Sequence, residues 1–295
     1  MFTIFGIPGP LLFGQLLLGL INGAFYAMLS LGLAVIFGLL NIINFAHGAL
    51  FMMGAFVAWM LLNYAGIGYW WALLLAPLIV GAFGLVLERT LISRLYKLDH
   101  LYGLLLTFGL ALVIEGLFRN EYGSSGMPYQ IPSALQGATN LGFMFLPNYR
   151  GWVVVAALVV CIATWLLIEK TKLGAMLRAA TENAPLVQAF GVNVPRMVTL
   201  TYAGGVALAA LAGVLAAPIY SVNPNMGSSF INTVFAVVVI GGMGSIIGSV
   251  ITGFGLGVIE GLTKVFYPEA SATVVFVVMA IVLLTRPARL FGKAA

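Results

Sequence analysis

Charged residues are scarce in this chain of 295 residues, because 13 Lys and Arg and 8 Asp and Glu together make up only 7% of it. Soluble proteins carry about 25% charged residues. A soluble fold of this length would need far more polar surface than these residues supply, and 62% of the residues are hydrophobic. The composition therefore excludes an ordinary soluble protein and indicates a chain that lies mostly in lipid.

Residues and motifs for catalysis are also nearly missing. The single cysteine, Cys161, can form neither an internal disulfide nor a zinc site, and the two histidines come without clustered carboxylates. The only Gly-Lys pair, Gly292-Lys293, is followed by Ala294 rather than by Ser or Thr, so there is no P-loop for ATP. We therefore expect that the chain is not an enzyme and binds neither a cofactor nor a metal itself.

Long apolar segments dominate what is present, and a helix needs about 20 apolar residues to cross a membrane. Residues 230–260 would form one helix of about 46 Å at 1.5 Å per residue, which is too long for one span. We expect this segment to enter the membrane and turn back. Residues 11–60 are likewise too long for one span. Together the segments predict an all-α transmembrane bundle with about eight to nine crossings, formed by one transmembrane domain over 1–295. The segments are 11–60, 70–87, 101–119, 151–168, 197–218, 230–260 and 271–285.

Basic residues orient these spans. Lys and Arg accumulate on the cytoplasmic side of membrane proteins. This topology explains the net charge of +5, so the charge is no sign of nucleic-acid binding. We therefore place 88–100, 169–196 and the C-terminus in the cytoplasm and the loop 120–150 outside. The residues on which this rests are Arg89, Arg94, Lys97, Lys170, Lys172, Arg178, Arg196, Arg286, Arg289 and Lys293.

Polar residues and glycines interrupt two of the apolar segments, near 41–48 and near 241–248. Broken helices at membrane depth are tolerated where they face protein or water, and interruptions in both halves of a chain mark transport sites. We therefore expect broken or re-entrant helices at both places. The expected break residues are Gly48, Gly241, Gly242, Gly244 and Gly248. The candidate residues of a translocation path are Asn41, Asn44, His47, Asn232, Thr233 and Ser245.

Other ionisable residues receive structural interpretations. For His47 we favour a fixed hydrogen bond over proton coupling. Glu115 and Arg119 are four residues apart, and we favour a structural ion pair over a substrate contact. Glu260 lies at a segment end near Lys264, which favours an interfacial role over a role deep in the membrane.

Glycine spacing predicts close helix packing. The pairs Gly19 and Gly23, Gly244 and Gly248, and Gly257 and Gly261 each have three residues between them. Such small-residue spacing lets transmembrane helices approach closely. We favour packing within the chain, with an interface to a second membrane subunit as the alternative.

The loop 169–196 contains a predicted pair of short helices. Apolar residues recur at helical spacing over 173–187 and form one stripe. Pro185 disfavours helical geometry at the preceding residue, so the first helix should end near Asn183, and Gly191 can close a second helix over 185–190. The unit could rest on the membrane surface or insert into a groove of a soluble partner.

The chain resembles, over nearly its whole length, the LivH-type permeases of branched-chain amino acid ABC importers. The motifs that carry the resemblance are Asn22-Gly23-Ala24-Phe25-Tyr26-Ala27, Asn44-Phe45-Ala46-His47-Gly48, Gly174-x-x-x-Arg178-Ala179 with Gly191-Val192, and Gly241-Gly242-Met243-Gly244-Ser245. Related permeases for urea, amides and sugars share much of this pattern.

The resemblance implies a subunit of the bacterial inner membrane that moves branched-chain or related neutral amino acids by alternating access. Its implied partners are a homologous second permease, two ATPase subunits that use ATP and Mg, and an extracytoplasmic substrate-binding protein. It also implies that 169–196 couples to the ATPase, with coupling residues Gly174, Leu177, Arg178, Ala179, Glu182 and Gly191. The rival interpretation is an ion-coupled secondary transporter, which would want buried carboxylates at mid-membrane.

Overall fold

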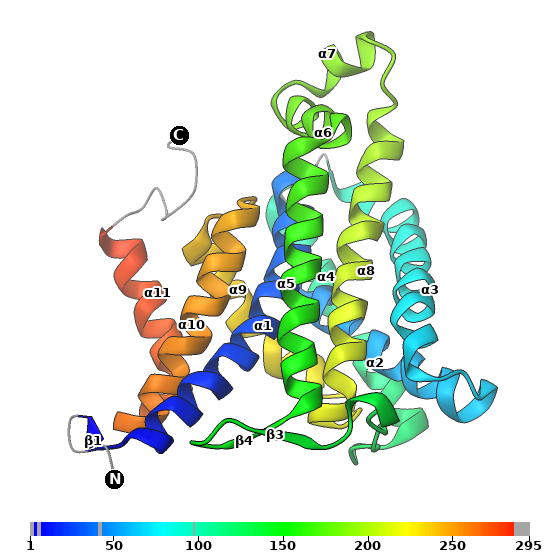
Figure 1. The fold of residues 1–295 in the computed structure, drawn as a ribbon. Helices are drawn as coiled ribbons and strands as arrows, with labels where there is room; N and C mark the ends of the chain where they lie inside the picture. The colour runs from blue at the N-terminus through cyan, green and yellow to red at the C-terminus, as the bar shows by residue number, and fades with distance from the viewer. Residues whose placement is uncertain (1–2, 5–6, 41–42, 97, 286–295) are drawn as a thin grey trace.

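The computed structural model describes residues 3–4, 7–40, 43–96 and 98–285, and these form an almost entirely helical bundle (Figure 1). The long helices are α1 (Gly9–Leu40), α2 (Ala46–Ala65), α3 (Tyr69–Thr90), α4 (His100–Tyr122), α5 (Asn148–Lys170), α8 (Val194–Tyr220) and α10 (Ile246–Phe266). The shorter helices are α6 (Lys172–Glu182), α7 (Ala184–Ala189), α9 (Met226–Gly241) and α11 (Val274–Thr285).

Seven helices of the described residues are long and apolar enough to cross a membrane, and the shorter α9 and α11 are also apolar. The chain is therefore a multi-pass membrane protein, and the predicted all-α bundle is confirmed. Burial separates the central helices from the peripheral ones. In the most apolar window of α1, 78% of the residues are buried, against 22% for α5, so α1 forms the middle of the bundle and α5 its edge.

The two ends of the bundle are built differently (Figure 1). At one end, here called the α6 end, lie α6, α7, the 3-10 helix η1 (Ile92–Leu95) and the last residues of α11. At the opposite end, here called the hairpin end, strands β3 (Ala138–Asn140) and β4 (Phe145–Pro147) pair antiparallel. The basic residues of the described 88–96 and 169–196 segments share the α6 end, as their distribution predicted.

The remaining small elements also belong to the hairpin end. Strands β1 (Thr3–Ile4) and β2 (Ile7–Pro8) form a second antiparallel pair, and 3-10 turns occur at η2 (Ser133–Leu135) and η3 (Pro268–Ala270). The loop between α4 and α5 is held down by an isolated bridge between Met127 and Val222. Burial raises the pKa of Tyr129 in this loop to about 12, so its hydroxyl stays neutral.

Close glycine contacts join α1 to α10 within the chain. A Cβ atom added at Gly19 would lie 2.5 Å from the carbonyl oxygen of Gly257, and one at Gly23 would lie 2.9 Å from Cα of Phe254. The same holds between α2 and α8, where a Cβ at Gly54 would lie 2.2 Å from the Ala210 carbonyl oxygen. The predicted intramolecular packing is therefore observed, because only glycine allows these backbones to touch.

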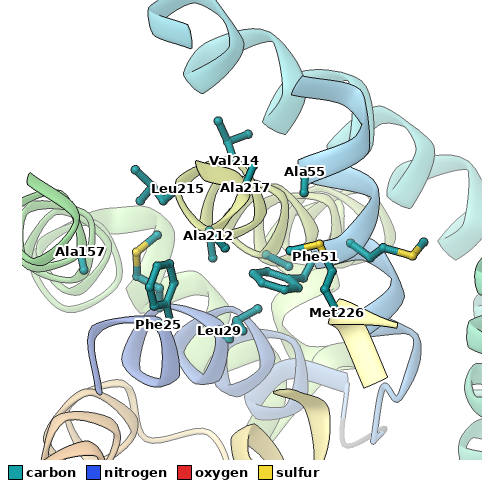
Figure 2. Packing of buried hydrophobic residues seen from close by; sticks show 14 of the residues in the cluster. Phe25, Leu29, Phe51, Ala55, Ala157, Ala212, Val214, Leu215, Ala217 and Met226 are labelled. Carbon is teal, nitrogen blue, oxygen red and sulfur yellow. The ribbon is translucent and has the colours of Figure 1, made fainter. Parts of the chain in front are cut away.

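The main hydrophobic core lies where α1, α2 and α8 meet, with α5 on one side. Figure 2 shows Phe25 and Leu29 of α1 pointing toward Phe51 of α2 and Ala212 of α8. All four side chains are at most 2% exposed. Because this core is in the middle of the bundle, it sets the spacing of the helices that carry polar residues.

Both predicted helix breaks occur. The second one separates α9 from α10, and Gly242 and Gly244 there have φ angles of 97° and 89°, which favour glycine. Ser245 caps α10, since its hydroxyl accepts a hydrogen bond from the Gly248 N–H at 3.1 Å.

Two of the glycines that we expected at the breaks lie elsewhere. Gly48 and Gly248 belong to the first turns of α2 and α10 rather than to the turns themselves. Their role in the structure is close contact: a Cβ at Gly48 would lie 2.7 Å from the Gly227 carbonyl oxygen, and one at Gly248 would lie 2.0 Å from that of Gly241. Asn41 lies outside the described residues.

Candidate translocation surface and coupling element

Asn44 and His47 are buried in the bundle rather than lining an open path. Their exposed fractions are 1% and 0%. The Asn44 amide donates a hydrogen bond to the Tyr202 hydroxyl at 3.0 Å, and His47 Nε2 lies 3.1 Å from the Leu29 carbonyl oxygen. The fixed hydrogen bond predicted for His47 is therefore present. These two hydrogen bonds hold the start of α2 to α8 and α1. Because both side chains are buried, neither is accessible to a solute in this conformation.

Helix α9 carries an exposed polar face near the hairpin end. Ser228, Ser229 and Asn232 are exposed, and Asn225 lies just before the helix on the same side. The rest of α9 is different, since its residues from Val234 to Gly241 are mostly buried and apolar. A polar face on a helix at membrane depth is costly in lipid, so this face should meet water or another protein.

Two charged residues of α4 reach the same part of α9. The Arg119 guanidinium donates a hydrogen bond to the Asn225 side-chain oxygen at 2.6 Å. Glu115 is only 8% exposed, and its carboxylate interacts with the backbone N–H of Ser228. The predicted Glu115–Arg119 ion pair was therefore wrong, because within the described residues the two side chains do not approach within 4 Å of each other. The first turn of α9 offers free N–H groups that attract the carboxylate instead.

The five predicted path residues that the structure describes do not form one site. Asn232 lies on the exposed face of α9 with Thr233 half-buried beside it, whereas Ser245 caps α10 near the α6 end. The polar residues Asn225, Ser228 and Ser229 were missed, although their spacing with Asn232 follows one helical face. The predicted apolar segment began only at residue 230, whereas α9 begins at Met226, so the polar residues before 230 were not assigned to the same helix as Asn232.

Glu260 lies six residues before the end of α10 at Phe266, and the interfacial role expected for it stays a prediction. Its carboxylate pairs with Lys264 at 2.6 Å and accepts a hydrogen bond from the Tyr26 hydroxyl at 2.7 Å. Nearby, the Tyr220 hydroxyl donates to the Asn22 side chain at 3.0 Å. These contacts join the hairpin-end parts of α1, α8 and α10, and both carboxylate oxygens of Glu260 are used.

The loop after α5 folds into the two predicted short helices. Helix α6 ends at Glu182, next to the predicted Asn183, and α7 spans Ala184–Ala189. The Asn183 side chain caps α7 by accepting a hydrogen bond from the Leu186 N–H at 3.0 Å. Gly191 follows with a φ of 85°, as expected for a residue that closes a helix.

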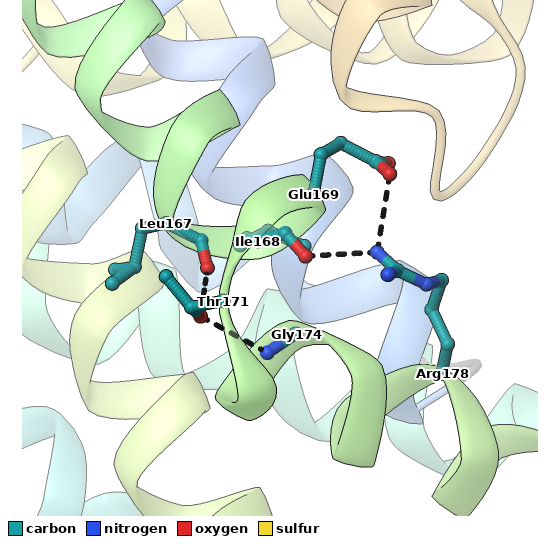
Figure 3. Close-up of polar contacts among 6 residues, drawn as sticks. All are labelled: Leu167, Ile168, Glu169, Thr171, Gly174 and Arg178. Atoms are coloured by element: carbon teal, nitrogen blue, oxygen red, sulfur yellow. Dashed lines mark hydrogen bonds and ion pairs between the residues drawn. The ribbon is translucent and has the colours of Figure 1, made fainter.

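One face of α6 is fixed to the end of α5 (Figure 3). Gly174 lies against the chain so closely that an added Cβ would be 1.6 Å from the Ile168 carbonyl oxygen. Arg178 donates to the same carbonyl at 2.8 Å and pairs with Glu169 at 3.2 Å. Thr171 links the two helices, since its hydroxyl donates a hydrogen bond to the Leu167 carbonyl oxygen and accepts one from the Gly174 N–H. Gly174 and Arg178 therefore attach α6 to the bundle.

The opposite face of the α6–α7 unit is exposed and partly apolar. The predicted single stripe divides: Leu177 and Ala180 are buried, whereas Leu173 and Met176 are 47% and 41% exposed. Phe190 after α7 is 80% exposed. Of the other predicted coupling residues, Ala179, Glu182 and Gly191 are exposed. The unit thus has an inner face bound to α5 and an exposed outer face.

Comparison with known proteins agrees with this architecture. Residues 15–284 match the family model described as branched-chain amino acid transport system / permease component. The chain is 30% identical to the high-affinity branched-chain amino acid transport system permease protein LivH of Salmonella typhimurium and 29% identical to that of Escherichia coli K12. It is also 29% identical to the corresponding protein BraD of Pseudomonas aeruginosa. Each alignment covers 95% of both chains, and no solved structure matches. The chain therefore belongs to the family of branched-chain amino acid transport permease components.

Proposed function

We propose that the chain is the membrane-spanning subunit of an ABC importer in the bacterial inner membrane, and that it moves branched-chain or related neutral amino acids. Family membership and the transport named for LivH and BraD support this substrate class. ATP and Mg are used by separate ATPase subunits, and the chain contributes a path that opens alternately to each side. An extracytoplasmic binding protein delivers the amino acid at the hairpin end.

The observation that carries the proposal is the two-faced α6–α7 unit. Its inner face is fixed to α5 through Gly174 and Arg178, so a push on the outer face is passed to the bundle. Its outer face presents Phe190 and Leu186, which are 80% and 53% exposed, and exposed aromatic and aliphatic anchors are typical of interfaces. In Figure 1, α7 projects beyond the ends of α5 and α8, which favours a soluble ATPase over the membrane surface as its partner.

The exposed polar face of α9 is our candidate for the path. Neutral hydroxyl and amide groups suit a zwitterionic solute that carries no net charge. Because this face is open in the single chain, we propose that a homologous second permease covers it, with the path between the two. In this arrangement 169–196 is cytoplasmic and 120–150 is extracytoplasmic.

Two other functions make different demands. An ion-coupled secondary transporter needs carboxylates at mid-membrane, but the buried Glu88 and Glu115 lie toward the ends of α3 and α4, and Glu260 is satisfied by Lys264 and Tyr26. A permease for urea, amides or sugars would share the coupling unit, so only substrate measurements separate it from the amino acid importer.

The test uses the complete complex in liposomes, with radiolabelled leucine, isoleucine and valine as substrates. We expect ATP-dependent uptake, and we expect Phe190→Ala to lower both ATPase co-purification and uptake. Phe145→Ala is the matched control for co-purification, since Phe145 is 69% exposed at the hairpin end. Uptake by the isolated chain driven by an ion gradient would overturn the proposal. Uptake of urea or a sugar in place of amino acids would overturn the substrate class alone.

A further inference from the structure

A groove of about 210 Å³ lies at the edge of the bundle, between α5 on one side and α3 and α8 on the other. A water molecule occupies about 30 Å³ in the liquid, and close-packed proteins leave few empty spaces larger than one water molecule. The groove belongs to neither the α9 face nor the α6–α7 unit. Among its lining residues are Leu73 of α3, Val155, Ala156 and Val159 of α5, and Leu211 and Leu215 of α8.

The wall of this groove offers no partner to a polar ligand. Its side chains are aliphatic apart from Trp152, and the indole N–H of Trp152 already donates a hydrogen bond to the Tyr69 hydroxyl at 3.0 Å. None of the described residues that line the groove is charged. Because a polar solute or a water molecule would lose its hydrogen bonds on entering, the groove suits an apolar ligand.

Aromatic residues place the groove just inside the hydrocarbon layer. At its hairpin end, the Tyr149 hydroxyl lies 3.0 Å from the Tyr69 hydroxyl, and the half-exposed Trp70 packs against Trp152 with ring centroids 5.5 Å apart. Tyr and Trp side chains are enriched where a membrane meets water. From Trp152 the groove continues to Val160, which is about 12 Å along a helix long enough to span the membrane.

The groove opens on the outer surface of the bundle. Val155 and Val159 at its rim are 55% and 60% exposed, whereas Leu215 of α8 at its floor is 1% exposed. At this depth the surroundings of a transmembrane helix are acyl chains. A second permease is expected elsewhere, because the polar face of α9 is costly in lipid and this apolar edge is not.

We propose that this groove binds one acyl chain of a membrane phospholipid, whose headgroup lies at the level of Tyr69, Trp70 and Trp152. The chain fills the space between α5 and α8 and contacts Leu211. Because the wall carries no charge, the hydrocarbon rather than the headgroup is recognised. The proposal needs only that the protein spans a membrane, so it does not depend on the transported solute.

The experiment uses a phospholipid that carries a photoreactive diazirine partway along one acyl chain. Purified full-length protein is reconstituted into liposomes with this lipid and irradiated, and the crosslinked residues are located by mass spectrometry. We expect crosslinks at Leu211 in addition to Val155 and Val159, with equal yield for phosphatidylethanolamine and phosphatidylglycerol. Lipids that only surround the bundle would label the rim residues and leave Leu211 unlabelled, which would overturn the proposal.

Variants of α5 test whether the crosslink at Leu211 comes through the groove. Ala156→Phe places a ring in the groove and should lower this crosslink several-fold, and Ala156→Leu provides a milder change if the larger residue prevents folding. Ala163→Phe is the matched control, because Ala163 is an exposed alanine of α5 that does not line the groove, and it should leave the crosslink unchanged.

Three other results would contradict the proposal. An unchanged crosslink at Leu211 in both Ala156 variants would show that the chain does not lie in the groove. A yield that depends strongly on the headgroup would overturn recognition through the hydrocarbon. A crosslink that occurs in the isolated protein and disappears in the assembled transport system would assign the groove to a protein partner instead.

Discussion

Replacing Gly174 by alanine tests whether α6 transmits force through its contact with α5. The added Cβ would lie 1.6 Å from the Ile168 carbonyl oxygen, and contacts below 3.0 Å require a shift of at least the difference, 1.4 Å. No side-chain rotation can relieve this contact, because the atom that the Cβ would meet is a backbone oxygen. Helix α6 must therefore move away from the end of α5.

The size of the effect follows from the contacts that are lost. Overpacking costs about 1–3 kcal/mol, and loss of the half-exposed Arg178 hydrogen bond to Ile168 adds about 1 kcal/mol. At about 1.4 kcal/mol per factor of ten, the docked arrangement of α6 becomes at least tenfold less favourable relative to the undocked one. The transmembrane core is far from this contact and should remain folded.

The assay is ATP-dependent amino acid uptake into membrane vesicles that contain the whole transport system, with the amount of the chain measured in parallel. We expect Gly174→Ala to lower uptake by about tenfold at unchanged membrane content. Gly204→Ala is the matched control, because an added Cβ at Gly204 meets no atom within 4 Å. The reasoning would be refuted if Gly174→Ala transported as well as the unmodified protein, or if Gly204→Ala were equally impaired.

Three further predictions test the other contacts. Arg178→Glu places a carboxylate beside Glu169 and the Ile168 carbonyl oxygen, and it should abolish ATP-coupled uptake without lowering the melting temperature of the bundle. Normal uptake would show that this contact is dispensable. Gly54→Ala forces α2 and α8 apart at Ala210 and should lower the free energy of unfolding by about 1–3 kcal/mol. Thermal unfolding in detergent measures this loss, with Gly204→Ala as the control because an added Cβ there meets no atom within 4 Å. Ser229→Cys on the exposed face of α9 should react with a membrane-impermeant thiol reagent in the assembled complex, whereas the buried Val238→Cys should not; equal labelling of the two would argue against a water-accessible path.

Much of the architecture follows from the sequence because lipid imposes simple rules. A chain in hydrocarbon must satisfy its backbone hydrogen bonds within each segment, so long apolar runs become helices. Breaks follow from local residues as well: Gly242 and Gly244 take left-handed φ angles between α9 and α10, and Gly191 does so after α7. Positions of this kind are readable because they depend on one residue and its neighbours along the chain.

The candidate site was less predictable because polar side chains choose partners that packing brings near. Glu115 was expected to pair with Arg119, yet each of them contacts the start of α9, more than 100 positions away. Asn44 was expected in the path, yet it donates to Tyr202, 158 positions along the chain. Spacing along one helix carries no information about the backbone groups that a second helix offers.

By itself, then, the sequence determined that the chain spans a membrane many times, where its helices break, and which end of the bundle carries the basic loops. Each of these depends on composition or on a few consecutive residues. Only the tertiary structure decided that Arg178 faces α5 rather than a partner, that His47 is sealed in the core, and that Ala156 shares a groove with Leu211. Those facts depend on the distances between helices, which the packing of the α1, α2 and α8 core sets.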